Sequence, residues 1–297
     1  MSEVTPTVVE EIERYLRTGG TDTSLAAWPD GSFIARAQRA HADLRGALVR
    51  QVRRLATGHS HEPLPVTDTV ALTRSKVEPM VRGLFPRVEQ EQVLAKLEKS
   101  VVFLTGANIE PVLLDEGFDH AAWVLANLYL ASLGAELLGD EAPHLVGVSQ
   151  ETTCYVSPEY FTEDDPFADF IVHEVAHIFH NCKRRTVGLT ETRTKEWLLN
   201  IEYRKRETFA YACEAYSRVL ERGRTAAQRR ALAAECHKTA ERISDERVEP
   251  GEVAGIVTEA ANARNGWKVI LARCAAVRRQ RSGAAAASPV APAARHR

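Results

Sequence analysis

The sequence predicts an α+β protein that is mainly α, with a small antiparallel sheet ahead of one chemically distinctive helix. Apolar residues recur at helical spacing through most of the 297-residue chain, which is typical of amphipathic helices packed around a core. Two stretches, 101–104 and 145–156, are instead rich in β-branched residues. We expect the first to be a strand and the second a strand or a hairpin that turns near Gln150 and Glu151.

Three regions are expected along the chain. Residues 1–100 should form a helical N-terminal region, and residues 101–281 a second domain that holds the distinctive helix. Residues 282–297 are rich in alanine and proline, so we expect a disordered tail. Thr5 and Pro6 suit the N-cap and first position of a first helix, which should stop at Gly19. Periodicity and breakers predict further helices over residues 32–57, 67–84, 86–100, 118–138, 195–222, 225–244, 250–263 and 267–280.

Composition narrows the function classes. Hydrophobic residues make up 44% and charged residues 26%, as in ordinary soluble domains, and the formal net charge is −2. Six arginines on the helix at 32–57 are interpreted as a solvated face, so we expect no nucleic acid partner. The five cysteines include no C-x-x-C pair, which fits a reducing compartment. Neither a secretory signal nor an apolar run of 18 residues is present, so we expect a cytoplasmic protein with no membrane segment.

One apolar helix carries the residues with chemistry. Asp165 can cap this helix and Pro166 can begin it. His173 and His177 are four residues apart, so their imidazoles lie about 6 Å apart along one face and can reach one Zn²⁺. Glu174 is rotated off that line and can face a zinc-bound water. This H-E-x-x-H spacing therefore predicts a zinc site with Glu174 as the general base.

The other histidines are weaker candidates. His180 lies three residues after His177, and we interpret it as a helix-end residue; a role in orienting a ligand or stabilising an oxyanion stays open. His59 and His61 lie in a proline-containing linker and are expected to be exposed rather than metal-bound.

A catalytic zinc site requires a third protein ligand and one open position. No histidine follows His180 until His237, so a carboxylate is expected. Glu207 is favoured because small alanines follow it and allow its helix to approach closely. Glu196 and Glu214 stay open as alternatives, and Glu214 can instead orient a zinc-bound histidine.

The stretch from Glu207 to Ala212 resembles a signature of ImmA/IrrE-type metallopeptidases. It keeps the glutamate, an aromatic residue at the fifth position (Tyr211) and alanine at the sixth, but lacks the Ala-Asn pair. More generally, residues 165–216 resemble gluzincins, in which a glutamate on the next helix completes the zinc site. The resemblance implies a zincin-like helical core in residues 101–281. It also implies a peptide or protein substrate, which for ImmA/IrrE-type proteins is a regulatory protein.

The sequence therefore predicts a zinc-dependent metallopeptidase with His173, His177 and Glu207 as metal ligands and Glu174 as the catalytic residue. The alternatives are a non-peptidase zinc hydrolase of small amides or esters, and a non-catalytic helical interaction protein with a degenerate motif. A fluorogenic peptide digest and metal analysis distinguish them.

Three further features are expected near the site. Tyr203, Tyr211 and Tyr216 are candidate hydrogen-bond donors to a transition state. By family analogy, residues 145–156 take the place of the zincin edge strand, which pairs with extended substrate. The basic residues 183–185 are expected in a solvated loop near the site mouth, where they would favour acidic substrate segments.

Overall fold

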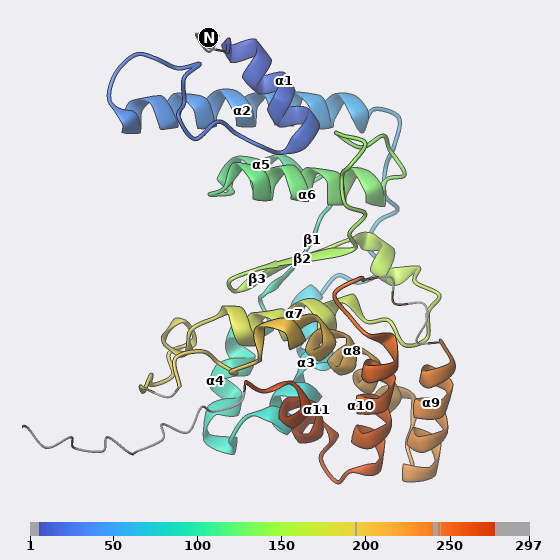
Figure 1. The fold of residues 1–297 in the computed structure, drawn as a ribbon. Coiled ribbons are helices and arrows are strands. Elements are labelled where there is room, and N and C mark those ends of the chain that lie inside the picture. The colour runs from blue at the N-terminus through green and yellow to red at the C-terminus, as the bar shows by residue number, and fades with distance from the viewer. Residues whose placement is uncertain (1–5, 194, 240–242, 244, 277–297) are drawn as a thin grey trace, which may run out of the picture.

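The computed structural model describes residues 6–193, 195–239, 243 and 245–276, and it confirms a mainly helical α+β architecture with a small sheet (Figure 1). The α-helices are α1 (Val8–Thr18), α2 (Phe33–Leu55), α3 (Thr69–Leu84), α4 (Arg87–Leu97), α5 (Ile109–Asp115), α6 (Asp119–Ser132), α7 (Phe170–Asn181), α8 (Arg206–Arg222), α9 (Ala226–Thr239), α10 (Pro250–Asn262) and α11 (Gly266–Cys274). The strands are β1 (Val101–Phe103), β2 (Gly147–Gln150) and β3 (Thr153–Val156), and the short 3₁₀ turns are η1 (Pro158–Phe161), η2 (Arg184–Val187) and η3 (Tyr203–Lys205). No helix in the described part of the chain is long and apolar enough to cross a membrane.

The first helix is capped two residues later than expected. Thr5 lies outside the described residues, and the side chain of Thr7 accepts the N–H of Glu10 while the Glu10 carboxylate accepts the N–H of Thr7. This reciprocal pair satisfies two donors that a helix start leaves free. Gly19 ends α1 as predicted, with φ 67° in the left-handed region.

Helix α7 begins at Phe170, so the predicted start at Asp165 and Pro166 is wrong. The Asp165 carboxylate accepts the N–H of Phe167 and caps a separate turn. Asp169 caps α7 instead, because its carboxylate accepts the N–H of Val172.

The predicted helix over residues 195–222 is also too long, because α8 begins only at Arg206. Residues 195–202 are not helical. The N–H groups of Leu198 and Leu199 donate to the carbonyls of Cys182 and Phe179, at the end of α7. These bonds to another element replace the helical hydrogen bonds that the local pattern favoured.

The sheet is mixed, not antiparallel as predicted, and its strand order is β1-β3-β2. Strands β2 and β3 form the expected antiparallel hairpin, with Glu151 at the turn in a left-handed conformation (φ 44°). Strand β1 pairs in parallel with β3, Val101 opposite Cys154. The chain between β1 and β2 forms α5 and α6, and such a long crossover is what a parallel pairing requires.

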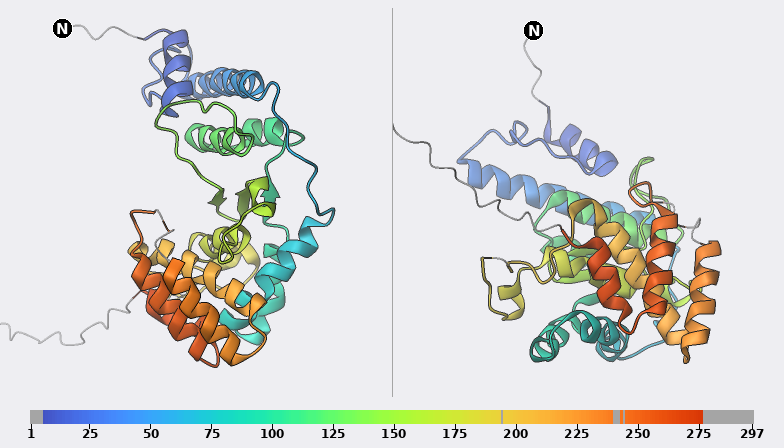
Figure 2. Two further views of the ribbon diagram at one scale, coloured as in Figure 1. Left: turned by 90° about the vertical axis from the view of Figure 1, so that its right-hand side faces the viewer. Right: turned by 60° about the horizontal axis from the view of Figure 1, so that its bottom comes forward.

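Two hydrophobic clusters lie on opposite sides of the sheet (Figures 1 and 2). Helices α1, α2, α5 and α6 form one cluster, and helices α3, α4 and α7–α11 form the other. Cys154 and Val156 of β3 are buried in the second cluster, whereas Val148 and Tyr155 pack against the first. The clusters therefore divide the chain differently from the expected boundary at residue 100, since α3 and α4 pack with the C-terminal helices.

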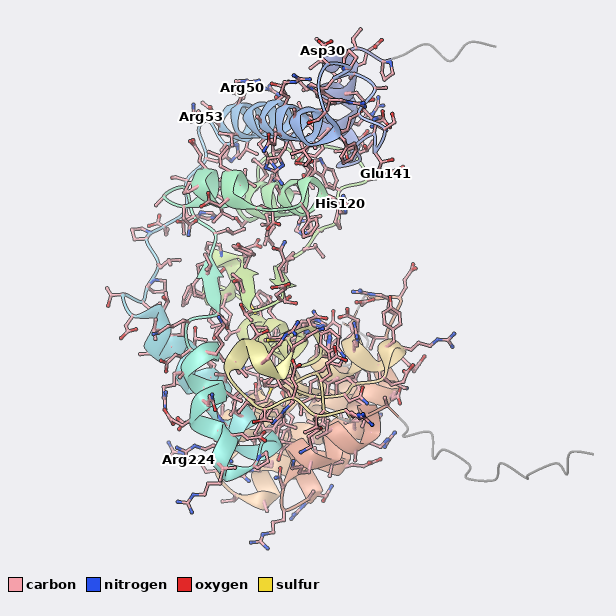
Figure 3. The ribbon with its side chains drawn as sticks, turned by 90° about the vertical axis from the view of Figure 1, so that its left-hand side faces the viewer. Asp30, Arg50, Arg53, His120, Glu141 and Arg224 are labelled. Atoms are coloured by element: carbon pink, nitrogen blue, oxygen red, sulfur yellow. The ribbon has the colours of Figure 1, made fainter. Side chains whose placement is uncertain are left out.

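One arginine of α2 does not belong to a solvated face. Arg45 is fully buried, and its guanidinium donates to the carboxylate of Asp119 and to the carbonyls of Leu113 and Glu116. It therefore holds α2 against the junction of α5 and α6. Arg50 lies on the outer side of α2, as expected (Figure 3). The predicted tail at 282–297 lies outside the described residues.

Candidate metal centre

Helix α7 is enclosed between the β2–β3 hairpin and α8 (Figure 1). Ile171, Val175 and Ile178 are fully buried, so the rotation of α7 about its axis is fixed by its apolar face. This rotation aims His173 and His177 at the first turn of α8, where Glu207 lies.

The structure brings together His173, His177 and Glu207, with one donor atom from each within 4.8 Å of the others. The two Nε2 atoms are 3.2 Å apart. The Glu207 Oε2 atom lies 3.2 Å from the His177 Nε2 atom and 3.8 Å from that of His173. Donors held tetrahedrally by zinc at about 2.0–2.1 Å lie about 3.3 Å apart. The three side chains therefore have the identity and spacing of a zinc ligand set.

The His173 ring is oriented by Glu214, one of the alternatives for the third ligand. The Nδ1–H of His173 donates to Glu214 Oε2 at 2.9 Å. The other oxygen of Glu214 accepts the backbone N–H of Asp169 at 2.8 Å, and the Glu214 side chain is buried. This bond leaves the Nε2 lone pair of His173 directed at the centre, an arrangement typical of metal-bound histidine.

His177 is oriented by a chain of two hydrogen bonds through His180. The His180 Nδ1–H donates to Asn181 Oδ1 at 3.0 Å, and the His180 Nε2 atom lies 3.0 Å from His177 Nδ1. Burial lowers the pKa of His180 to about 3, helped by the charges of His177 and Arg206, so its ring is neutral and Nε2 accepts. His180 is thus a helix-end residue, as expected, and also fixes the tautomer of His177.

Both imidazoles therefore direct lone pairs at one point, where a carboxylate oxygen also lies. Such a cluster is stable only around a positive charge. Burial would lower the pKa of His173, but the carboxylates of Glu207 and Glu214 outweigh it and raise that pKa to about 10. Burial would raise the pKa of Glu207, but His173 and His177 hold it well below its usual value. The centre thus favours a cation, and its donor set fits Zn²⁺.

Glu207 is held from both sides. Its Oε2 atom faces the imidazoles, and its Oε1 atom forms an ion pair with the guanidinium of Arg247 at 2.9 Å. Arg247 is itself paired with Asp245, in the segment before α10. Arg247 and Asp245 could not be predicted as site residues, because they lie in a polar segment far downstream with no sequence pattern that links them to α7.

Glu174 lies beside the ligands, in contact with the β2–β3 hairpin. A Cβ atom at Gly147 of β2 would lie 2.6 Å from Glu174 Oε1, so only glycine allows the carboxylate this position. Glu174 is 7% exposed. Burial raises its pKa, and the neighbouring His173 and His177 oppose that shift.

The ligands and Glu174 line a cavity of about 1080 Å³. Residues 144–149, which include β2, form one wall, and α7 with the first turns of α8 forms another. Residues 163–168 and the segment of Asp245 and Arg247 line the remaining sides. Tyr211 also lines the cavity, and its ring meets that of His173 edge-on with centroids 4.6 Å apart.

Several predicted site residues lie elsewhere. Glu196 is exposed and pairs with Lys183 at 2.8 Å, so it is not near the centre. Tyr216 packs against Trp267 of α11 and does not line the cavity. Tyr203 lines the cavity and is exposed at its rim. His59 and His61 contact the end of α6 and are not ligands of this cluster.

The basic residues 183–185 do not line the cavity. Arg184 is buried and pairs with Glu89 of α4 at 2.7 Å, and Arg185 faces Glu191. The expectation that these residues favour acidic substrate is therefore wrong, because their charges are neutralised within the fold.

Comparisons with known protein families, with curated proteins and with solved structures found no match to this chain. The geometry of the centre and its cavity therefore carries the functional argument.

Proposed function

We propose that this protein is a zinc-dependent metallopeptidase of the zincin class. The observation that carries the proposal is the convergence of the His173, His177 and Glu207 donor atoms beside the buried carboxylate of Glu174. Zinc sites that keep an open position for water typically use this combination of two histidines and one carboxylate.

In the proposed hydrolysis, the metal ligands, Glu174 and Tyr211 have separate roles. Zn²⁺ held by the three side chains would supply the Lewis acidity that lowers the pKa of a water and polarises a carbonyl. Glu174 accepts the proton of the attacking water and delivers it to the leaving nitrogen. Its buried position supports this role, because burial raises the pKa of Glu174 toward the range in which a carboxylate takes up a proton. The Tyr211 hydroxyl is the candidate donor to the developing oxyanion.

An extended peptide fits this cavity better than a small amide does. Strand β2 is at the edge of the sheet, with β3 on one side and no described strand on the other. Because residues 146–149 line the cavity, its free backbone groups lie beside the centre. A substrate chain can therefore add to β2 as a further strand and pass Glu174 and the ligands.

Metal analysis tests the centre itself. We expect one zinc per chain in the wild-type protein, and a large loss of zinc in His177→Ala and Glu207→Ala. Glu196→Ala is the matched control, since Glu196 lies outside the centre and should leave the zinc content unchanged. A wild-type protein without affinity for zinc would refute the proposal and favour a non-catalytic helical protein.

The reaction is tested by digestion of a fluorogenic peptide library with the zinc-loaded protein. Glu174→Gln should keep zinc and fold while lowering peptide hydrolysis by about 10²–10⁴-fold, the usual contribution of a general base. Full activity in this variant would exclude Glu174 as the base. Cleavage of small amides or esters without any peptide cleavage would instead favour the small-molecule hydrolase.

A further inference from the structure

Two arginines line the cavity together with His180 and Asn181 of α7. Arg204 belongs to η3 and Arg206 begins α8, and both line the same cavity as the metal ligands. His180 is one helical turn beyond His177 on α7, about 4.5 Å along the axis. Arg206 directly precedes the candidate ligand Glu207, and neither arginine belongs to the ligand set.

Arg206 has no acidic partner among the described residues, although it lines the cavity and directly precedes Glu207 on α8. Arg247, which also lines the cavity, forms an ion pair with Glu207, and Arg218 of α8 forms one with Glu221. The Arg206 Nε atom is buried and has no hydrogen-bond acceptor in the described part of the chain. A buried donor without an acceptor costs free energy, so such a group is retained where a ligand can complete it.

The Arg206 side chain is also held in place. Its guanidinium carbon lies 5.2 Å from the centroid of the Tyr203 ring, a cation–π contact with another cavity residue. A stacked guanidinium presents a planar fork that matches a carboxylate in a bidentate way.

We propose that Arg206, supported by Arg204, forms a carboxylate-binding subsite next to the metal centre. The inference rests on the proposed peptidase function and names its substrate class: peptides with a carboxylate close to the scissile bond. That carboxylate belongs either to an aspartate or glutamate side chain or to the free C-terminus, and the two sources share the same recognition chemistry.

Binding of small peptides tests the subsite without turnover. The zinc-loaded Glu174→Gln protein is titrated with two matched pairs of probes. One pair is acetyl-Gly-Glu-Gly-amide with its Gln counterpart, and the other is Gly-Gly-Gly with its C-terminal amide. In at least one pair the carboxylate form should bind at least about tenfold more tightly than the neutral form, as expected for a hydrogen bond to a charged group.

Substitution of Arg206 tests whether this residue causes the preference for the carboxylate form. In Arg206→Gln on the same background, the preference for the carboxylate form should disappear while the zinc content is unchanged. Arg224→Gln is the matched control, because Arg224 is exposed at the opposite end of the molecule from α1, away from the cavity (Figure 3). Arg206→Lys keeps the charge without the planar fork and should retain part of the preference, which also covers the case that the Gln variant does not fold.

The outcomes separate the two proposals. The subsite is overturned if neither pair shows a preference, or if Arg206→Gln binds the carboxylate form as tightly as its parent. The pair that responds identifies the side chain or the C-terminus as the source. If Arg206-dependent binding is found but zinc-loaded wild-type protein cleaves no peptide, the subsite stands and the peptidase function fails.

Discussion

At the scale of single residues, the hydrogen-bond chain from His177 to Asn181 has a measurable consequence. Replacing His180 with alanine removes the acceptor that holds the His177 ring. Loss of such a partner typically costs about 10–100-fold in metal affinity. We expect a shift of this size in the zinc dissociation constant of His180→Ala, measured by competition with a chromogenic chelator. His144→Ala, an exposed change in the same cavity, is the control. Equal affinities in both variants would assign His180 a packing role only.

Gly147 offers a second test on one residue. Its backbone is not in the left-handed region, so alanine is acceptable to the strand itself. The added methyl group would lie 2.6 Å from Glu174 Oε1 and displace the carboxylate. Gly147→Ala should therefore keep zinc but lower peptide hydrolysis at least about tenfold, since a general base must lie within hydrogen-bond reach of its proton. Gly255→Ala on α10, where the methyl group meets open space, should leave the rate unchanged.

At the scale of elements, the start of α7 ties the metal centre to α3. The Asp169 carboxylate caps α7 and lies 3.2 Å from the ammonium group of Lys76 on α3, while its backbone N–H bonds Glu214. Asp169→Ala should lower the free energy of unfolding by roughly 1–3 kcal/mol, from the lost cap and the lost ion pair with Lys76, which keeps Glu221 as its other partner. Urea denaturation measures this change.

Two comparisons refine that expectation. Asp169→Asn keeps a capping oxygen and should cost less than the alanine variant. Asp68→Ala removes the exposed cap of α3, and this loss should be about 1 kcal/mol. If Asp169→Ala cost no more than Asp68→Ala, the ion pair with Lys76 would contribute nothing.

How much of these elements the sequence could predict depends on the range of the interactions involved. The histidine pair follows from spacing on one helix, and the structure places His173 and His177 on one face of α7. The identity of the third candidate ligand depends on how α8 is rotated and translated against α7. The local sequence pattern could therefore only rank Glu207 ahead of Glu214 and Glu196. The local sequence pattern predicts a helix over residues 195–202. That pattern contains no information on the carbonyls at the end of α7, which accept the backbone N–H groups of this segment in the structure.

At the scale of the whole molecule, the two hydrophobic clusters should respond differently to zinc. The ligands belong to α7 and α8, in the cluster that excludes α1 and α2. Zinc at 100 times its dissociation constant stabilises the state that binds it by about 2.7 kcal/mol. Hydrogen exchange should therefore slow in α7 and α8 on zinc addition and stay unchanged in α1.

The same effect should weaken in acid. Metal binding needs neutral imidazoles and an ionised carboxylate, so protons compete with zinc as the pH falls. The protection of α7 and α8 at a fixed zinc concentration should thus be smaller at about pH 5.5 than at about pH 7.5, because the raised pKa of His173 leaves protons in competition with zinc over this whole range. Uniform protection of all helices would mean that the molecule opens as one cooperative unit. Protection that did not depend on pH would argue against histidine ligands.

The position of the sheet between its two helical layers limits how the molecule can be shortened. The layer above it is assembled from two separate stretches of chain, α1–α2 and α5–α6, with α3, α4 and β1 between them. A fragment that starts after α2 would still contain α5 and α6, but it would lack the helix that packs against both of them. No single cut can therefore separate the candidate metal centre from this layer. Removing the layer would require a new linker from β1 to β2 and polar replacements on the strand face that it covers.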